Sequence, residues 1–447
     1  LPLRCHYFVS APWVCYNPAS LGRLQQAGPV LRLMAGPNRS VPYLIAAMCL
    51  AETLGMMGIF AFPALLPRFF EIWHLTNTQA GWINGIYFAG YTLGVPILVT
   101  LTDRLDARRI YLTSTAVGAL TALGFALFAQ GFWTALLFRA LAGLGLAGTY
   151  IPGLRALVDR IEGPAQARAI SFYTAAFGLG VGFSFFANGQ LERWLGWQWA
   201  FGLAAMGSLI ALILAAWALA PQPPKTETLP LAKLFDFRPV FRNPGAMAYI
   251  LAYAVHVWEI FTFRSWVVAF LAFSLTLQSR ASLIAPTLVA AVSSLAAMWA
   301  SIGGAELAVR YGKRRVLTLI MGGSALMAAG LGFTATWPYP VLIGLIIIYA
   351  CFVQGDSATV HAGVVQSAEA GRLGVTMAVQ SFLGFTCAFL GPLVFGLVLD
   401  VSGFGETPRS WGLAFMATGA VIATGPIILA WLLPKAHPLR DERVEPI

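Results

Sequence analysis

Six ionisable residues lie inside long apolar stretches of this 447-residue chain, at positions where a charge needs a partner. They are Glu52, Arg139, His256, Glu259, Arg264 and Asp356. An ionised side chain at the centre of a bilayer costs about 2.5–3.5 kcal/mol, so such groups face a cavity or an opposite charge. Carboxylates, arginines and a histidine in such a place could bind an anion or carry protons.

Glu52 and Arg139 are predicted to reach similar depths from opposite sides of a bilayer. At the helical rise, Glu52 lies about 16 Å into segment 41–62 and Arg139 about 10 Å into segment 132–151. We expect the two side chains to pair or to compete for a bound solute. The alternative is a permanent ion pair that only fixes helix packing.

His256 and Glu259 are three residues apart, so a helix places them on one face. A histidine beside a carboxylate titrates near neutral pH and can pass protons on, although the pair could equally serve packing. Arg264 is expected to extend to the outer interface. Asp356 is expected a turn or two from the inner side, as a proton site or an inner gate, with His361 at the interface.

The composition excludes an ordinary soluble enzyme, a disordered chain and a nucleic-acid binder. Apolar residues make up 58% of the chain and charged residues 10%, and the mean hydropathy is +0.75. Soluble proteins carry about 25% charged residues. The five cysteines lack metal-ligand spacing, and no nucleophile–base pair is evident. We therefore expect no metal, no cofactor and no catalytic site.

Twelve stretches are long and apolar enough to span a membrane as helices, which predicts an all-α membrane protein. They are 41–62, 79–101, 110–130, 132–151, 170–188, 199–219, 245–271, 283–304, 316–336, 341–360, 373–399 and 411–433. With a cytoplasmic N-terminus, 22 of the 28 Lys and Arg residues fall in inner segments and 4 in outer loops. This asymmetry predicts a protein of the cytoplasmic (inner) membrane with both termini cytoplasmic.

The spans divide into two six-helix repeats. The Pro-, Lys- and Arg-rich stretch 221–244 separates bundles at 41–220 and 245–434, and the tails are 1–40 and 435–447. Asp103 and Val309 begin similar basic loops at an offset of 206, which Gly178 and Gly384 share. Met34, just before the first span, is expected to be the native start. Parallel repeats of this kind are typical of transporters with a binding site between the halves.

The loop after the second span resembles the major facilitator superfamily pattern Gly-x-Leu-x-Asp-Arg-x-Gly-Arg/Lys-Arg/Lys. Residues 99–108 carry its acid and bases, with Val99 and Asp106 in place of the glycines, and residues 305–314 form a second copy in which Val309 replaces the acid and Glu306 is nearby. The matching gate residues are Asp103, Arg104, Arg108, Arg310, Gly312, Lys313 and Arg314. Segment 132–151 also resembles the family from Arg139 to Gly145.

The resemblance implies that the gate residues latch the inner helix ends in the outward-open state. A carboxylate can pair with neighbouring arginines and accept from helix N-terminal N–H groups. The alternative is that the basic run only follows the positive-inside rule. We favour the latch for the Asp103 copy, while the two readings are balanced for the Val309 copy.

The resemblance implies a monomeric secondary transporter that works by alternating access in membrane lipid. A proton-coupled symporter for a small, polar, anionic solute is favoured: Arg139 would attract the solute, and Glu52 or the His256/Glu259 pair would carry the proton. Residues 178–183 lack the proline of the antiporter signature, and no phosphate-binding loop for ATP is present. The alternatives are a drug or metabolite exporter and a non-transporting sensor or scaffold. Aromatic candidates for solute contact are Trp82, Tyr87, Tyr91, Tyr173, Tyr253 and Trp258.

Overall fold

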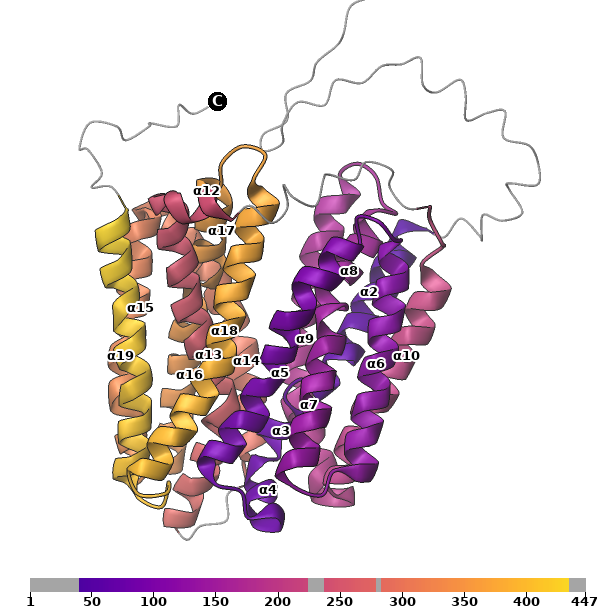
Figure 1. The fold of residues 1–447 in the computed structure, drawn as a ribbon. Coiled ribbons are helices and arrows are strands. Elements are labelled where there is room, and N and C mark those ends of the chain that lie inside the picture. The colour runs from indigo at the N-terminus through magenta and orange to yellow at the C-terminus, as the bar shows by residue number, and fades with distance from the viewer. Residues whose placement is uncertain (1–39, 224–236, 279–282, 434–447) are drawn as a thin grey trace, which may run out of the picture. The chain divides into compact units, whose positions relative to one another are not determined.

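A computed structural model describes residues 40–223, 237–278 and 283–433. Within these ranges, 12 helical segments are long and apolar enough to cross a membrane. The elements of the first six spans lie together, and so do those of the last six (Figure 1). The predicted fold class, an all-α protein with two six-helix repeats, is confirmed. The expected start at Met34 and the tails lie outside the described residues, Ser40 excepted.

The first half contains α2 Val41–Gly55, η2 Met56–Gly58, α3 Ala61–Ala64, α4 Leu66–Trp73, α5 Asn77–Leu101, α6 Ala107–Phe128, α7 Phe132–Ala147, α8 Tyr150–Val158, α9 Ala165–Leu195 and α10 Trp197–Ala218. The second half, preceded by the short helix α12 Arg238–Arg242, contains α13 Pro244–Leu277, α14 Pro286–Tyr311, α15 Lys313–Leu331, η3 Gly332–Thr334, α16 Tyr339–Gly355, α17 Ser357–Ser367, α18 Leu373–Val401 and α19 Pro408–Leu432.

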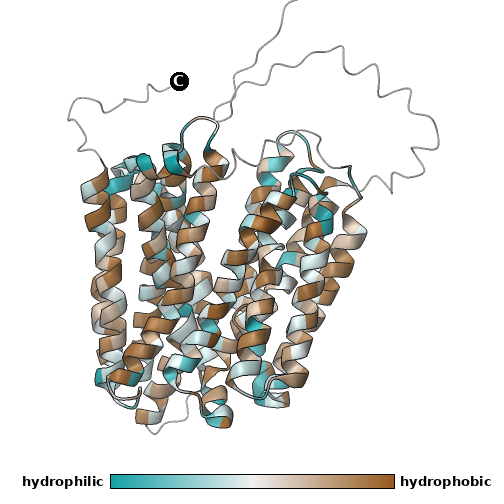
Figure 2. Ribbon diagram, viewed as in Figure 1, coloured by the Kyte–Doolittle hydropathy of each residue, from teal (hydrophilic) through white to brown (hydrophobic). Residues whose placement is uncertain are grey.

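Large apolar side chains cover the outer faces of the helices. Trp133, Leu326 and Trp431 are 77%, 77% and 86% exposed. Apolar residues run along the helices, while hydrophilic ones gather at both helix ends (Figure 2). Contiguous apolar surface on this scale fits a protein whose outer faces contact lipid.

Three of the described spans are interrupted where the sequence predicts unbroken helices. The first span breaks after Gly55, the fourth at Gly148–Thr149 and the tenth at Asp356. The fourth and tenth spans are equivalent in the repeat. Their breaks are separated by nearly the same number of residues as the two basic loops. A break frees backbone carbonyl groups, which must find donors inside the protein because lipid supplies none.

Side chains of α9 satisfy the break in the first span. Ser184 Oγ and Asn188 Nδ2 donate to the Met57 carbonyl oxygen at 2.8 and 2.9 Å. The Phe60 N–H donates to Ser184 Oγ at 3.3 Å. Ser184 and Asn188 are fully buried, so α9 carries the polar groups that this interruption needs.

We expect Asn188→Ala to lower the free energy of unfolding by about 1–3 kcal/mol, because the buried Met57 carbonyl would lose one of its donors. Unfolding by SDS titration in detergent micelles measures this change. Gln190→Ala, on the same helix, is the matched control and should leave the midpoint nearly unchanged. Equal losses in the two variants would contradict the assignment.

Candidate functional site

The two halves contact each other closely through α5 and α18. A methyl group on Gly81 would lie 2.6 Å from the Pro392 carbonyl oxygen, and one on Gly85 would lie 2.3 Å from the Phe389 carbonyl oxygen. Only glycine permits this approach of the two backbones. The ribbons of α5 and α18 lie side by side here and separate toward the end that carries α12 (Figure 1).

Asp400 of α18 caps the N-terminus of α5 across the boundary between the halves. Its Oδ1 accepts from the Asn77 N–H at 3.1 Å and from Asn77 Nδ2 at 2.8 Å, and its Oδ2 accepts from the Thr78 N–H at 2.8 Å. Asn77 Nδ2 also donates to the Phe404 carbonyl oxygen at 2.9 Å. A carboxylate at a helix N-terminus is further stabilised by the helix dipole. Sequence analysis did not identify this contact.

Aromatic rings fill the boundary between the halves next to these contacts. The rings of Tyr91 and Phe385 have centroids 4.2 Å apart, and so do those of Phe88 and Phe261. Phe60, at the break in the first span, stacks on Phe261 at 6.4 Å. The Asp400 cap joins the halves at the end opposite α12, and this layer continues the contact toward the middle of α5 and α18.

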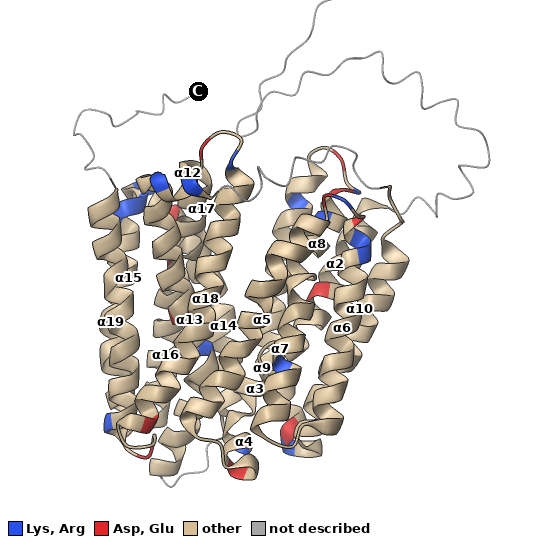
Figure 3. Ribbon diagram, in the orientation of Figure 1, with Lys and Arg blue, Asp and Glu red and all other residues tan. Residues whose placement is uncertain are grey.

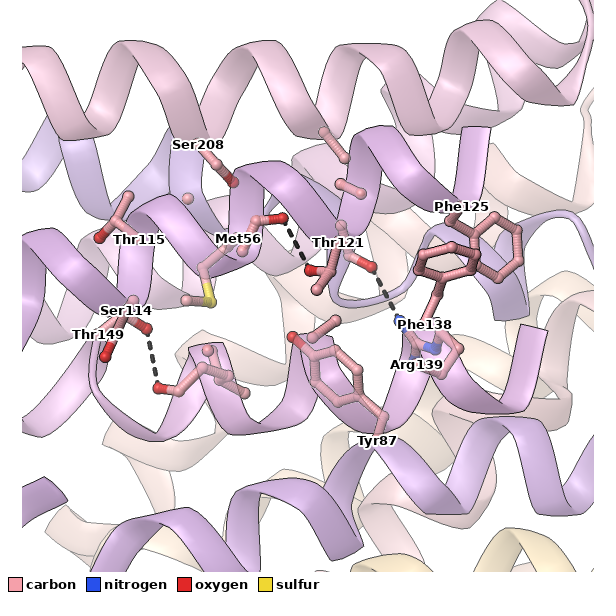
Figure 4. A pocket seen from close by; sticks show the side chains of 18 of the residues that line it. Met56, Tyr87, Ser114, Thr115, Thr121, Phe125, Phe138, Arg139, Thr149 and Ser208 are labelled. Atoms are coloured by element: carbon pink, nitrogen blue, oxygen red, sulfur yellow. Dashed lines mark hydrogen bonds between the residues drawn. The ribbon is translucent and has the colours of Figure 1, made fainter. Parts of the chain in front are cut away.

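Glu52 lies buried in the first half beside a small polar cavity. Tyr173 OH donates to Glu52 Oε2 at 2.6 Å, whereas Glu52 Oε1 has no hydrogen-bond partner among the described residues. The cavity measures about 50 Å³, enough for a few water molecules. Besides Glu52 and Arg139, its lining is rich in hydroxyl groups, from Tyr87, Tyr111, Ser114, Thr115, Thr121, Thr149 and Ser208 (Figure 4).

Arg139 points to the break in the first span. Its guanidinium donates to the carbonyl oxygens of Gly58 and Ile59, both at 3.2 Å, and lies 4.0 Å from the ring centroid of Tyr87 (Figure 4). No ion pair joins it to Glu52 within the described ranges, so the predicted direct pairing is wrong. The physical reason is that the broken helix offers free carbonyl groups to the guanidinium. Arg139 and Glu52 nevertheless line one cavity.

In the second half, the partner of His256 is Asp356 and not Glu259. His256 Nδ1 lies 2.7 Å from Asp356 Oδ1, and both side chains are buried. Glu259 instead accepts a hydrogen bond from Ser324 Oγ. Asp356 lies between α16 and α17, well inside the span Tyr339–Ser367 and opposite His256 of α13. The expectation that Asp356 lies close to the inner side is therefore wrong.

Arg264 points into the protein and not to the outer interface. Its guanidinium donates to Gln354 Oε1 at 3.4 Å and lies 5.5 Å from the ring centroid of Phe60 in the other half. Snorkelling is unnecessary here because an amide and an aromatic face are available inside. His361 is exposed and contacts Gln380 at 3.1 Å through Nδ1.

The predicted gate residues of the first half contact elements of the same half. Asp103 Oδ1 lies 2.5 Å from Arg155 NH1 of α8, and Arg108 NH2 donates to the Ala216 carbonyl oxygen of α10 at 3.0 Å, while Arg104 is exposed. In the second copy, Lys313 contacts Gln366, Arg314 donates to the Ala430 carbonyl oxygen, and Arg310 is exposed. The latch between halves stays a prediction about another conformation.

Asp106, which stands where the family pattern has glycine, is the most strongly coordinated carboxylate of this loop. It accepts from the Arg108 N–H at 3.0 Å, from the Gln222 N–H at 2.8 Å and from Arg160 NH2 at 3.0 Å. Burial opposes its ionisation, but these hydrogen bonds outweigh burial and hold the pKa of Asp106 below its ordinary value. The contact ties the start of the linker to the first half.

Two repeated six-helix bundles, joined at one end and each containing buried titratable groups, are an arrangement typical of membrane transporters. The chain belongs to the Major Facilitator Superfamily, whose sequence model matches residues 48–383. This family consists of membrane transporters.

Among relatives, human protein spinster homolog 1 is 24% identical over 248 residues, which cover 53% of this chain and 46% of the human protein. The niacin transporter NiaP of Acinetobacter baylyi is 26% identical over 157 residues, 35% of each chain. The chain thus spans about half or less of the relatives that it matches.

Solved structures share the fold. A bacterial homolog of the human lysosomal transporter spinster, inward-facing and unoccupied, superposes with a TM-score of 0.65 at 16% identity, covering 89% of this chain and 96% of that one. A mutant of the nucleoside transporter NupG has a TM-score of 0.71 at 14% identity, covering 88% and 100%.

We expect Asp400→Asn to shift the protein toward a conformation in which the ends opposite α12 separate, because charge-assisted hydrogen bonds to α5 weaken by about 1.5–3 kcal/mol in total. Spin labels at Glu71→Cys and Glu406→Cys, in a background without native cysteines, report the distance between the halves. Glu192→Gln, whose carboxylate pairs with Arg68 inside the first half, is the control. An unchanged distance distribution in Asp400→Asn would refute the cap as a closing contact.

The lowered pKa of Asp106 predicts a pH-dependent contribution to stability. Because its folded pKa lies below the unfolded value of about 3.9, the contribution is complete above that pH and is lost as the pH falls through the folded pKa. Thermal unfolding of the Asp106→Asn variant should show a clear loss against the wild type at pH 7, and the difference should shrink below about pH 4. Glu162→Gln, an exposed carboxylate nearby, should differ little from wild type at either pH. A constant Asp106→Asn difference down to pH 3 would contradict this.

Proposed function

We propose that the protein is a proton-coupled symporter that carries a small organic anion into the cell by alternating access. The observation that carries this proposal is that Glu52 and Arg139 line one cavity without forming an ion pair. A buried charge without a counter-charge is costly, so Arg139 is suited to an anionic group and Glu52 to a proton.

This arrangement supplies a physical reason for coupling. With the cavity empty, the positive charge of Arg139 and an ionised Glu52 partly offset each other across it. A bound anion would take up the electrostatic attraction of Arg139 and repel the Glu52 carboxylate. Protonation of Glu52 would relieve that repulsion, so anion and proton would enter together.

The second half supports a further proton site. His256 and Asp356 form a buried pair, and Glu259 lies one turn along α13 from His256. Arg264, which makes no ion pair within the described part of the chain, adds a second positive charge near Phe60 at the boundary. Alternating movement of the halves could then expose each titratable group to one side of the membrane.

The aromatic layer between the halves favours a solute with an apolar or aromatic part. Tyr87 lies beside Arg139, and Tyr91 stacks on Phe385 of the other half. An aromatic carboxylate would match the chemistry of both the rings and the guanidinium. The name of one relative, the niacin transporter, specifies a solute of this chemical class.

Charge distribution supports the orientation. Lys and Arg gather at the end of the bundles that carries α12 (Figure 3). We propose that this end is cytoplasmic and that the membrane is the inner cell membrane. The halves are then joined on the outer side, as expected for an inward-facing conformation.

We expect Glu52→Gln, in proteoliposomes, to abolish solute accumulation driven by a pH gradient while preserving exchange of labelled for unlabelled solute, because a neutral amide cannot cycle a proton. The solute comes from a thermal-shift screen of niacin, other carboxylates, amino acids and nucleosides at pH 5.5 and 7.5. Glu192→Gln is the charge-matched control and should retain both activities.

Three results would contradict this function. Accumulation by Glu52→Gln equal to wild type would exclude Glu52 as the coupling group. Outward movement of the solute against an inward proton flux would indicate an exporter. Binding without flux would indicate a sensor.

A further inference from the structure

The two copies of the basic loop differ in how their charges are neutralised. In the first half, Asp103 pairs with Arg155 and Asp106 with Arg160. The repeat offset of 206 places Val309 and Gly312 at the positions of these two acids. The second copy has therefore lost both carboxylates and their arginine partners, whose equivalents are His361 and Gln366, while the loop itself keeps Arg310, Arg314 and Arg315.

The conformation of the second loop accounts for the replacement of the second acid. Gly312 adopts a φ of +85° between α14 and α15, a value that favours glycine. Val309 is 82% exposed, so the residue replacing the first acid lies on the surface. Arg315, the repeat equivalent of Arg109, is exposed and makes no ion pair among the described residues.

An open pocket of about 620 Å³ lies at this loop. Lys313, Arg314 and Arg315 contribute three positive charges to its lining, and Tyr249 and Thr318 contribute hydroxyl groups. Among the residues that the structure describes, no acidic side chain lines it. The pocket lies at the boundary between helix ends and apolar helix surface, the level at which lipid headgroups contact a membrane protein.

We propose that this pocket binds the phosphate headgroup of an anionic phospholipid. The headgroup would supply a negative charge to Lys313 and Arg315, in a loop that has no carboxylate at the positions equivalent to Asp103 and Asp106. Apolar or aromatic side chains beside the pocket favour a lipid over a free anion: Tyr311 and Leu319 are 61% and 64% exposed, and Val309 is close in sequence. These side chains can contact the glycerol backbone and the first part of the acyl chains.

The test uses the purified full chain in a neutral detergent, titrated with phosphatidylglycerol and followed by thermal unfolding. Phosphatidylcholine, glycerol 3-phosphate and inorganic phosphate are titrated in parallel to separate the lipid from its headgroup chemistry. We expect saturable stabilisation by phosphatidylglycerol and little change with the other three. Equal stabilisation by a soluble phosphate would overturn the lipid assignment in favour of a free anion.

Substitutions locate the effect. Arg315→Gln should raise the half-saturating mole fraction of phosphatidylglycerol by about fivefold, the effect of one cation at a membrane surface. Arg315→Lys should retain wild-type binding, and Arg109→Gln, which removes the same charge at the equivalent position of the first half, should have no effect. Equal losses in Arg315→Gln and Arg109→Gln would show that general surface charge, and not this pocket, attracts the lipid.

Arg315→Gln removes an exposed side chain, so folding is not at risk in the main variant. Lys313→Gln tests a second cation of the pocket independently. Unlike Arg315, Lys313 also contacts a side chain of another helix, Gln366 of α17. If Lys313→Gln is less stable than wild type without lipid, the shift that lipid produces is measured from the variant's own lipid-free melting temperature. A full response in both variants would refute the pocket.

Discussion

The rest of the first half depends on one feature, the interruption of the first span. Side chains of α9 and α7 donate to the backbone carbonyl groups that this interruption frees. Lipid cannot donate to the free carbonyls of Met57, Gly58 and Ile59, so α9 and Arg139 must. This requirement directs the guanidinium away from Glu52. It thereby leaves a buried carboxyl group and a buried guanidinium that share a cavity without forming an ion pair.

The second half uses a different interruption for a related purpose. The break between α16 and α17 places Asp356 against His256, where an unbroken helix would change the direction of its side chain. The seventh span is continuous, whereas its repeat equivalent, the first span, is broken. The two bundles therefore share their architecture, but helix breaks at different places in each bundle position their ionisable groups.

Two kinds of contact join the halves: a close approach of two backbones that only glycine allows, and hydrogen bonds that fix the relative position of α5 and α18. Gly81 and Gly85 let the backbones of α5 and α18 approach, which is a steric condition. Asp400 adds direction, because its carboxylate matches the N–H groups at the start of α5. Hydrogen bonds of this kind at one end of the halves can be exchanged for contacts at the other, which the proposed alternating access would require.

Local sequence properties determined the number of spans, the two repeats, the asymmetry of Lys and Arg and the set of ionisable residues within the spans, because each depends on apolar length or residue type alone. The tertiary structure decided the partners: Tyr173 for Glu52, backbone carbonyls for Arg139, Asp356 for His256 and Gln354 for Arg264. Those pairings join helices far apart in the chain and depend on where helices break. Helical periodicity describes which residues share a face, and it carries no information about which face of another helix lies opposite.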